Sequence, residues 1–291
     1  MKTAIIGAGK MGVWFAKYCG EKGDLVVLAD RKAERLEGLE ESLGVETTLD
    51  FGRAIKEADR VMICVSIKAF EEVVKKISPY VTQHQAVMDI CSIKEFPVKV
   101  MHEHLGKGLI LGTHPVFGPG SKDIKHKAFI LTPTNKKEQD FAEQYKKWLE
   151  KEGANVFIMP PQKHDELMSV VLGLPHFLGL VACETLLEQP NFLETKEVAG
   201  TTYKMLFTLA EATALETPDL YASLQLNLPE LGKIEKTFIA KAQEWLDLIK
   251  EKDAQAIVNR MEELKKKLLK TDSDFAKSYE IMYKMLESAE Q

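Results

Sequence analysis

Over the first 160 residues, short apolar runs alternate with stretches whose apolar residues recur every three or four positions. The short runs are rich in valine, isoleucine and leucine and are bounded by glycine or polar residues, which indicates strands. The expected strands are 3–6, 25–29, 60–65, 86–90, 109–112, 128–132 and 155–159. The expected helices are 11–22, 32–43, 51–56, 70–77 and 137–151. This alternation predicts an α/β fold of the Rossmann type, with a doubly wound and mainly parallel sheet.

The pattern changes after Pro160 and Pro161. No strand-like run follows, and two long segments, 237–251 and 253–269, place apolar residues at helical spacing. We therefore expect two domains, an α/β domain over residues 1–160 and an all-helical C-terminal domain over residues 161–291.

The helical half contains the most apolar stretch of the chain, residues 170–187. Pro175, His176 and Glu184 interrupt it, which predicts a buried core helix or helix pair and not a membrane span. Farther along, apolar residues at helical spacing are expected in the core: Trp245, Leu246, Leu248, Ile249, Ile257, Met261, Leu264 and Leu268.

Charge and cysteine content narrow the class of protein. The formal net charge of -5 gives no broad basic field for nucleic acid, so neither nucleic acid nor a membrane is an expected partner. The four cysteines lack metal-ligand spacing, which predicts a reducing compartment with no disulfide framework and no metal site. The N-terminus runs directly into a strand-like segment without a cleavage pattern, so we expect a cytoplasmic protein without a signal peptide.

A glycine-rich turn joins the first expected strand to the first helix. It runs from Gly7 through Ala8, Gly9, Lys10 and Met11 to Gly12. The first glycine permits a tight turn, the second lets backbone approach a pyrophosphate, and the third allows close helix packing. Unpaired N–H groups at the helix N-terminus favour the phosphates. In this context the turn predicts a dinucleotide site in the α/β domain.

Residues at the ends of later strands indicate which dinucleotide binds. Asp30 ends the second strand, where a carboxylate accepts hydrogen bonds from ribose hydroxyls and repels a 2′-phosphate, so NAD is expected. Arg31 follows directly and leaves NADP open as an alternative. Val65 and Ser66 end another strand at the same edge of the sheet and are further cofactor candidates, with a turn or cap as the alternative for Ser66.

Two polar segments follow apolar strands farther along, at 89–94 and 112–120. Oxidation of an alcohol requires a base for the hydroxyl proton while hydride leaves the carbon, and neutral histidine suits this near neutral pH. His114 lies just past an expected strand, so it is the candidate base. Of the other histidines, His176 is expected to be buried and hydrogen-bonded, and a polar setting predicts solvated rings for the rest: His84, His102, His104, His126 and His164.

The motifs GAGKMG, DICSIK, GTHPVFGPG and LPHF, together with a lysine-rich helical C-terminal half, resemble the prephenate dehydrogenase family over nearly the whole chain. The resemblance implies that His114 accepts the hydroxyl proton and that Ser92 orients it. It also implies that His176 contacts the substrate, in place of the core role above. Thr113, beside the base, is a further substrate-binding candidate.

The implied reaction is the oxidative decarboxylation of prephenate to 4-hydroxyphenylpyruvate in tyrosine biosynthesis, with reduction of the nicotinamide. The family binds a substrate carboxylate through an arginine of the helical domain, but the matching stretch, 200–208, has none. Lys204 is the candidate substitute, as a point charge without bidentate geometry, with a surface lysine as the alternative. Arogenate therefore stays open as the substrate.

The resemblance also implies a homodimer formed through the helical domain, with no regulatory domain in this chain. Two other functions remain open. One is a β-hydroxyacid or imine-type dehydrogenase of similar architecture. The other is a protein that senses the nucleotide without catalysis.

Overall fold

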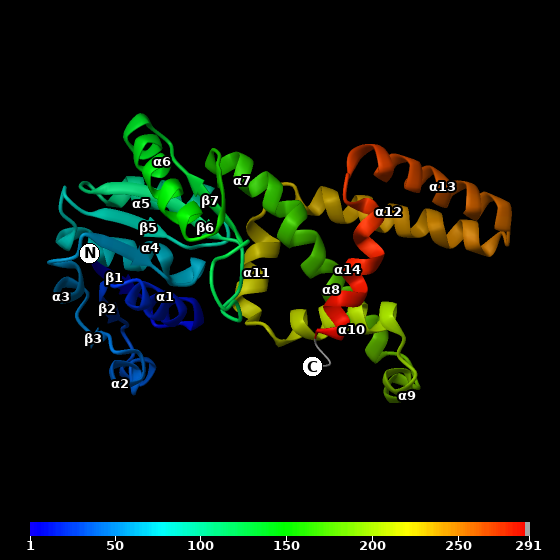
Figure 1. Cartoon of the computed structure of the whole chain (residues 1–291), viewed down its shortest axis with the longest axis horizontal. Coiled ribbons are helices and arrows are strands. Elements are labelled where there is room, and N and C mark those ends of the chain that lie inside the picture. The colour runs from blue at the N-terminus through cyan, green and yellow to red at the C-terminus, as the bar shows by residue number, and fades with distance from the viewer. Residues whose placement is uncertain (289–291) are drawn as a thin grey trace. The chain divides into compact units, whose positions relative to one another are not determined.

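In the computed structural model, which describes residues 1–288, the chain forms two compact units (Figure 1). The first comprises Met1–Met168 with Ala222–Pro229, and the second comprises Ser169–Tyr221 with the residues from Glu230 onward. The predicted boundary between residues 160 and 161 lies eight residues before the boundary between Met168 and Ser169. The prediction also did not include the return of Ala222–Pro229 to the first unit. Residues 289–291 of the predicted second domain lie outside the described residues.

The first unit is built on an eight-stranded sheet in the order β3-β2-β1-β4-β5-β6-β7-β8. Every neighbouring pair is parallel except β6 and β7, which confirms the predicted Rossmann-type, mainly parallel sheet. The strands are β1 (Lys2–Ile6), β2 (Leu25–Ala29), β3 (Glu46–Thr48), β4 (Arg60–Ile63), β5 (Ala86–Asp89), β6 (Leu109–Pro115), β7 (Ala128–Thr132) and β8 (Asn155–Ile158). No strand follows Ile158 within residues 1–288.

Helices cover both faces of this sheet (Figure 1). They are α1 (Lys10–Glu21), α2 (Leu39–Leu43), α3 (Phe51–Ile55), α4 (Ile67–Ile77), α5 (Glu95–His104), α6 (Lys136–Lys151) and α7 (Pro161–Met168). One apolar core packs α3, α4 and α5 against one face, and a second packs α1 and α6 against the other. Burial on both faces explains why the central strands are continuous apolar runs.

Two local predictions were wrong. The helix expected over 32–43 is interrupted, because Gly38 adopts a left-handed conformation with φ of 73° between the 3-10 turn Ala33–Arg35 and α2. The strand expected to end at residue 112 continues to Pro115, because β7 pairs with it in the antiparallel direction. His114 therefore lies inside β6 and not just past it.

The second unit is entirely helical among its described residues. Its elements are α8 (Leu174–Leu187), α9 (Phe192–Glu197), α10 (Thr201–Leu215), α12 (Leu231–Lys250), α13 (Ala254–Thr271) and α14 (Ser278–Glu287), with α11 (Pro218–Asn227) shared between the units. Glycines allow close packing in this unit: a Cβ on Gly173, just before α8, would lie 2.6 Å from Leu231, and one on Gly179 would lie 2.3 Å from Thr213.

Much of the apolar surface predicted to form core is exposed in the single chain. The helical run Pro161–Leu187 is long and apolar enough to cross a membrane by length and composition alone, a test that core helices also pass, and only 11% of its most apolar window is buried. Several apolar residues of α12 and α13 are exposed as well: Leu246, Ile249, Met261, Leu264 and Leu268. The prediction of a buried core was therefore wrong for these segments within one chain.

Candidate active site

The glycine-rich turn has the geometry that a dinucleotide requires. Gly7 has φ of 112°, and a Cβ there would lie 2.4 Å from the carbonyl oxygen of Cys64. A Cβ on Gly12 would lie 1.8 Å from the carbonyl oxygen of Gly7, whereas one on Gly9 would meet open space. No side chain caps the N-terminus of α1, which begins at Lys10. The turn thus fits a pyrophosphate on the backbone N–H groups of this helix.

Asp30 is fixed at the end of β2 by the same turn. Its Oδ2 accepts a hydrogen bond from the Ala8 N–H at 2.8 Å, and its Oδ1 accepts one from the Lys32 N–H at 3.0 Å. The neighbouring guanidinium groups already face carboxylates, Arg35 at 3.5 Å from Asp30 and Arg31 at 3.7 Å from Glu72. A buried carboxylate therefore stands where ribose hydroxyls are bound in such sheets.

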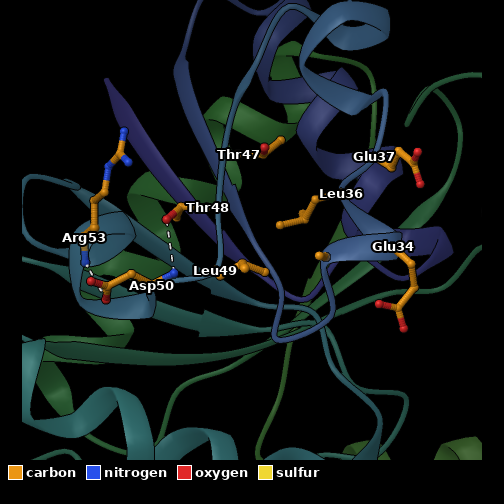
Figure 2. A pocket seen from close by; sticks show the side chains of 9 residues that line it. Glu34, Leu36, Glu37, Thr47, Thr48, Leu49, Asp50 and Arg53 are labelled. Atoms are coloured by element: carbon orange, nitrogen blue, oxygen red, sulfur yellow. Dashed lines mark hydrogen bonds between the residues drawn. The ribbon is translucent and has the colours of Figure 1, made fainter.

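A pocket of about 850 Å³ adjoins the segments that follow β2 and β3 (Figure 2). Its lining includes the carboxylates of Glu34, Glu37 and Asp50 but a single guanidinium, that of Arg53. Asp50 begins α3 by accepting hydrogen bonds from the N–H groups of Gly52 and Arg53. The pocket lies at the carboxyl ends of its strands, and its excess of negative charge disfavours an additional phosphate.

Ser66 and Val65 follow β4 at the same edge of the sheet. Ser66 precedes α4 in the N-cap position, but its side chain makes no capping hydrogen bond and is exposed. Val65 is half-buried and packs against the core beneath α4. The hydroxyl of Ser66 is thus not used as a helix cap.

His114 is the first member of a buried hydrogen-bonded chain. Its Nδ1 lies 2.8 Å from Nε2 of His164, whose Nδ1 lies 2.7 Å from Oδ1 of Asp165. His114 is 3% exposed and His164 is 0% exposed. The prediction that His164 is solvated was wrong, because α7 turns this residue and Asp165 toward the sheet and only their neighbours toward water.

Burial controls the charge of these rings. It holds the pKa of His114 well below the usual value, and His164 and Lys94 lower it further. Burial also lowers the pKa of His164, although the hydrogen bond to Asp165 opposes this effect. Both imidazoles are therefore neutral near pH 7, as a general base must be before it takes a proton.

A buried ion pair between Lys94 and Asp89 fixes the backbone next to this hydrogen-bonded chain. Lys94 and Asp89 are both 0% exposed, and the Lys94 Nζ donates to Asp89 Oδ2 and to the carbonyl oxygen of Thr113 at 2.6 Å. Asp89 also accepts hydrogen bonds from the N–H groups of Cys91 and Thr113. Gly112, next to Thr113, is also closely packed, since a Cβ there would lie 2.3 Å from the hydroxyl of Thr132. The backbone that carries His114 is thereby tied to β5.

The loop after His114 is held against α1. Trp14 donates a hydrogen bond from Nε1 to the carbonyl oxygen of Ser121 at 2.6 Å, and its ring contacts Phe117 at 5.0 Å between centroids. The helix that begins at the glycine-rich turn therefore also positions the loop that follows the candidate base.

Ser92 and Thr113 differ in what their hydroxyls do. Thr113 is buried and donates its hydroxyl to the carbonyl oxygen of Asp89, so this group is engaged within the protein. Ser92 is half-buried, and no hydrogen bond of its hydroxyl is found among residues 1–288.

The sequence analysis did not identify His164, which forms a hydrogen bond with Nδ1 of the candidate base His114.

The remaining substrate candidates belong to the second unit. His176 contacts the ring of Tyr221 at 4.3 Å between centroids, and its Nδ1 is buried without a hydrogen-bond partner among the described residues. The prediction that His176 is hydrogen-bonded in the core was therefore wrong. Burial lowers the pKa of His176, and the Glu216 carboxylate opposes this shift. Lys204 lies on the exposed part of α10.

The profile of the prephenate dehydrogenase nucleotide-binding domain matches residues 15–158, and that of the prephenate dehydrogenase dimerization domain matches residues 160–263. The crystal structure of prephenate dehydrogenase from Aquifex aeolicus with hydroxyphenyl propionate and NAD+ has a TM-score of 0.77 and 25% sequence identity, covering 94% of this chain and 98% of that one.

Curated relatives align along most of the chain. A probable arogenate/prephenate dehydrogenase from Methanocaldococcus jannaschii is 36% identical over 91% of this chain and 60% of its own length. The cyclohexadienyl dehydrogenase of Zymomonas mobilis is 26% identical over 93% of this chain and 97% of its own length. The chain spans less than two thirds of the Methanocaldococcus protein and of two further relatives, at 60%, 64% and 65%.

Proposed function

Because the chain belongs to the prephenate dehydrogenase family, we propose that it catalyses the nicotinamide-dependent oxidative decarboxylation of prephenate to 4-hydroxyphenylpyruvate, a step of tyrosine biosynthesis. The observation that carries this proposal is the His114 imidazole, which is buried, neutral and held in the same sheet as the glycine-rich turn. In this proposal the predicted first domain, residues 1–160, binds the dinucleotide. The predicted second domain, residues 161–291, binds the substrate and forms the dimer.

The proposed chemistry needs few groups from the protein. His114 accepts the proton of the ring hydroxyl on Nε2, since its Nδ1 faces His164. A bound nicotinamide would supply the acceptor for the hydride that leaves the ring carbon bearing this hydroxyl. The carboxylate on the ring departs as carbon dioxide, and its bonding electrons complete the aromatic ring. Burial keeps His114 neutral and able to accept the proton.

The cofactor is held by the residues of the glycine-rich turn, Gly7 to Gly12, and by residues at the ends of β2 and β4. Asp30 binds the ribose hydroxyls, with Arg31, Val65 and Ser66 nearby. NAD is favoured over NADP, because the carboxylate of Asp30 is fixed by two N–H groups and the adjoining pocket is acidic.

For the substrate we propose His176 and Lys204 as binding residues and Ser92 as a contact to the reacting hydroxyl. Thr113 is not proposed, because its hydroxyl is engaged by Asp89. Arogenate is the second candidate substrate, and Glu216 favours it. The Glu216 carboxylate opposes the lowering of the His176 pKa that burial causes, and the same negative charge would attract the ammonium group that arogenate has and prephenate lacks.

A four-way assay tests both choices. Nicotinamide reduction is followed with NAD and with NADP, each against prephenate and against arogenate. We expect turnover with at least one of the two substrates and a kcat/KM at least tenfold higher with NAD, which corresponds to about 1.4 kcal/mol. Turnover with neither substrate, under conditions in which NAD binds, would contradict the proposed function and would favour nucleotide sensing.

We also propose a homodimer in the cytoplasm. The family profile over residues 160–263 is that of a dimerization domain, and apolar side chains of α8, α12 and α13 are exposed in the single chain. A second copy would remove this surface from water. Light scattering should give twice the chain mass of 32.8 kDa, and a mass of one chain at micromolar concentration would contradict the dimer.

A further inference from the structure

His164 and Asp165 are buried titratable residues that the reaction outlined above does not use. They are 0% and 2% exposed, and they adjoin His114 on the side opposite the nitrogen that takes the substrate proton. Two backbone N–H groups fix the carboxylate: Lys94 donates to Oδ1 at 2.7 Å and Glu95 donates to Oδ2 at 3.0 Å. Asp165 thereby anchors the start of α5 and faces the imidazole of His164 in one orientation.

We propose that His164 and Asp165 are positioning residues that set the tautomer of His114 and then receive the positive charge formed there. The inference rests on the proposed function, because it concerns the same proton. It deepens that function by assigning a second imidazole to the path of the proton.

The tautomer follows from the chemistry of the partners. A carboxylate only accepts hydrogen bonds, so the Nδ1 of His164 must carry the hydrogen in the contact with Asp165. A neutral His164 then has a lone pair on Nε2, and Nδ1 of His114 must donate to it. Nε2 of His114 is consequently left without a hydrogen. This is the form that a general base requires.

Two protons move in the transfer, each across one hydrogen bond. The O–H bond of the substrate breaks as the Nε2–H bond of His114 forms. The Nδ1–H bond of His114 then breaks as the Nε2–H bond of His164 forms. His114 ends neutral, and the positive charge lies on His164 beside the negative charge of Asp165. The other charged groups facing the pair are Lys94 and Asp89, which neutralise each other.

The test uses two variants of the full-length protein. In Asp165→Asn the amide can donate to His164, which reverses both tautomers and places a hydrogen on the catalytic nitrogen of His114. We expect kcat to fall about 10²–10⁴-fold, the range for loss of a general base. In His164→Gln the amide oxygen still accepts from His114 but cannot take a proton, so a smaller loss of about tenfold is expected. His84→Gln, at an exposed histidine, is the matched control and should leave kcat unchanged.

The pH profile of kcat separates this role from a structural one. Asp165 raises the pKa of His164, so Asp165→Asn should move the acid limb to lower pH. His164 lowers the pKa of His114, so His164→Gln should move the acid limb to higher pH. Opposite shifts support the inference. Wild-type profiles in both variants, with only a lower melting temperature, would overturn it.

A second measurement is independent of turnover. In protein labelled with ¹⁵N at histidine, spectra at pH 7 should show the hydrogen on Nδ1 in both His114 and His164, and Asp165→Asn should move both hydrogens to Nε2. A hydrogen on Nε2 of either ring in the wild type would overturn the inference. If these spectra agree but neither prephenate nor arogenate is turned over, the inference about the two rings stands and the proposed function fails.

Discussion

Replacing His114 with alanine should lower kcat by about 10²–10⁴-fold, the usual effect of removing a general base. The imidazole is 3% exposed, and among the described residues no other side chain forms a hydrogen bond with Nε2 of His164. Water is not expected to replace it, because burial excludes solvent from this part of the sheet. Steady-state rates with the better of the two substrates, measured at saturating NAD, give the effect.

The control for this variant is cofactor binding. Gly7, Gly9 and Asp30 are on other strands or turns, so titration with NAD should give the wild-type affinity. An alanine variant with near-wild-type turnover would reassign the base.

The wild-type rate should also stay on its plateau below pH 6.5, since burial places the pKa of His114 well below that value and the ring loses its base function only on protonation.

Replacing Lys94 with methionine should lower the free energy of unfolding by about 3–5 kcal/mol, the cost of leaving one charge of a buried pair without its partner. Lys94 and Asp89 are both 0% exposed, and the ammonium group also binds the carbonyl oxygen of Thr113. Loss of Lys94 therefore leaves the Asp89 carboxylate facing an apolar side chain. Urea unfolding followed by circular dichroism measures the change.

Lys99→Met is the matched control, because Lys99 is an exposed lysine of α5 with a side chain that is 72% exposed. Its stability should change by less than about 0.5 kcal/mol. The double variant Asp89→Asn with Lys94→Met removes both charges and should recover part of the loss. A single Lys94→Met variant as stable as its control would show that the pair contributes nothing to the fold.

The nucleotide-binding half could be predicted because its signals are local. In the turn from Gly7 to Gly12, Gly7 has a positive φ and both Gly7 and Gly12 have no room for a Cβ. Only glycine fits these two positions, so the motif is visible in the sequence. Strand β3 was missed, because three residues, Glu46 to Thr48, are too few and too polar to show a period.

The partner of the candidate base was missed for a different reason. His164 stands among charged residues in sequence, which suggested solvent. Its helix nevertheless has a periodic buried face, with Pro161, Asp165 and Met168 on the same side. That period was present in the sequence, but polar residues on it hid the pattern.

The exposed apolar residues of α12 and α13 show a limit of another kind. Helical spacing predicts that Leu264 and Leu268 are covered, but it does not distinguish cover by the same chain from cover by a second copy. The sequence also contains no sign that the Nδ1 of His176 is buried without a partner, because that depends on the contact with Tyr221.

A crystal structure with NAD+ and hydroxyphenyl propionate, the ligands bound to the Aquifex aeolicus enzyme, tests the role of His114 most directly. We expect Nε2 of His114 within hydrogen-bond distance of the ligand hydroxyl, with Nδ1 still on His164. An imidazole turned away from the ligand hydroxyl, with another side chain in its place, would contradict the assignment.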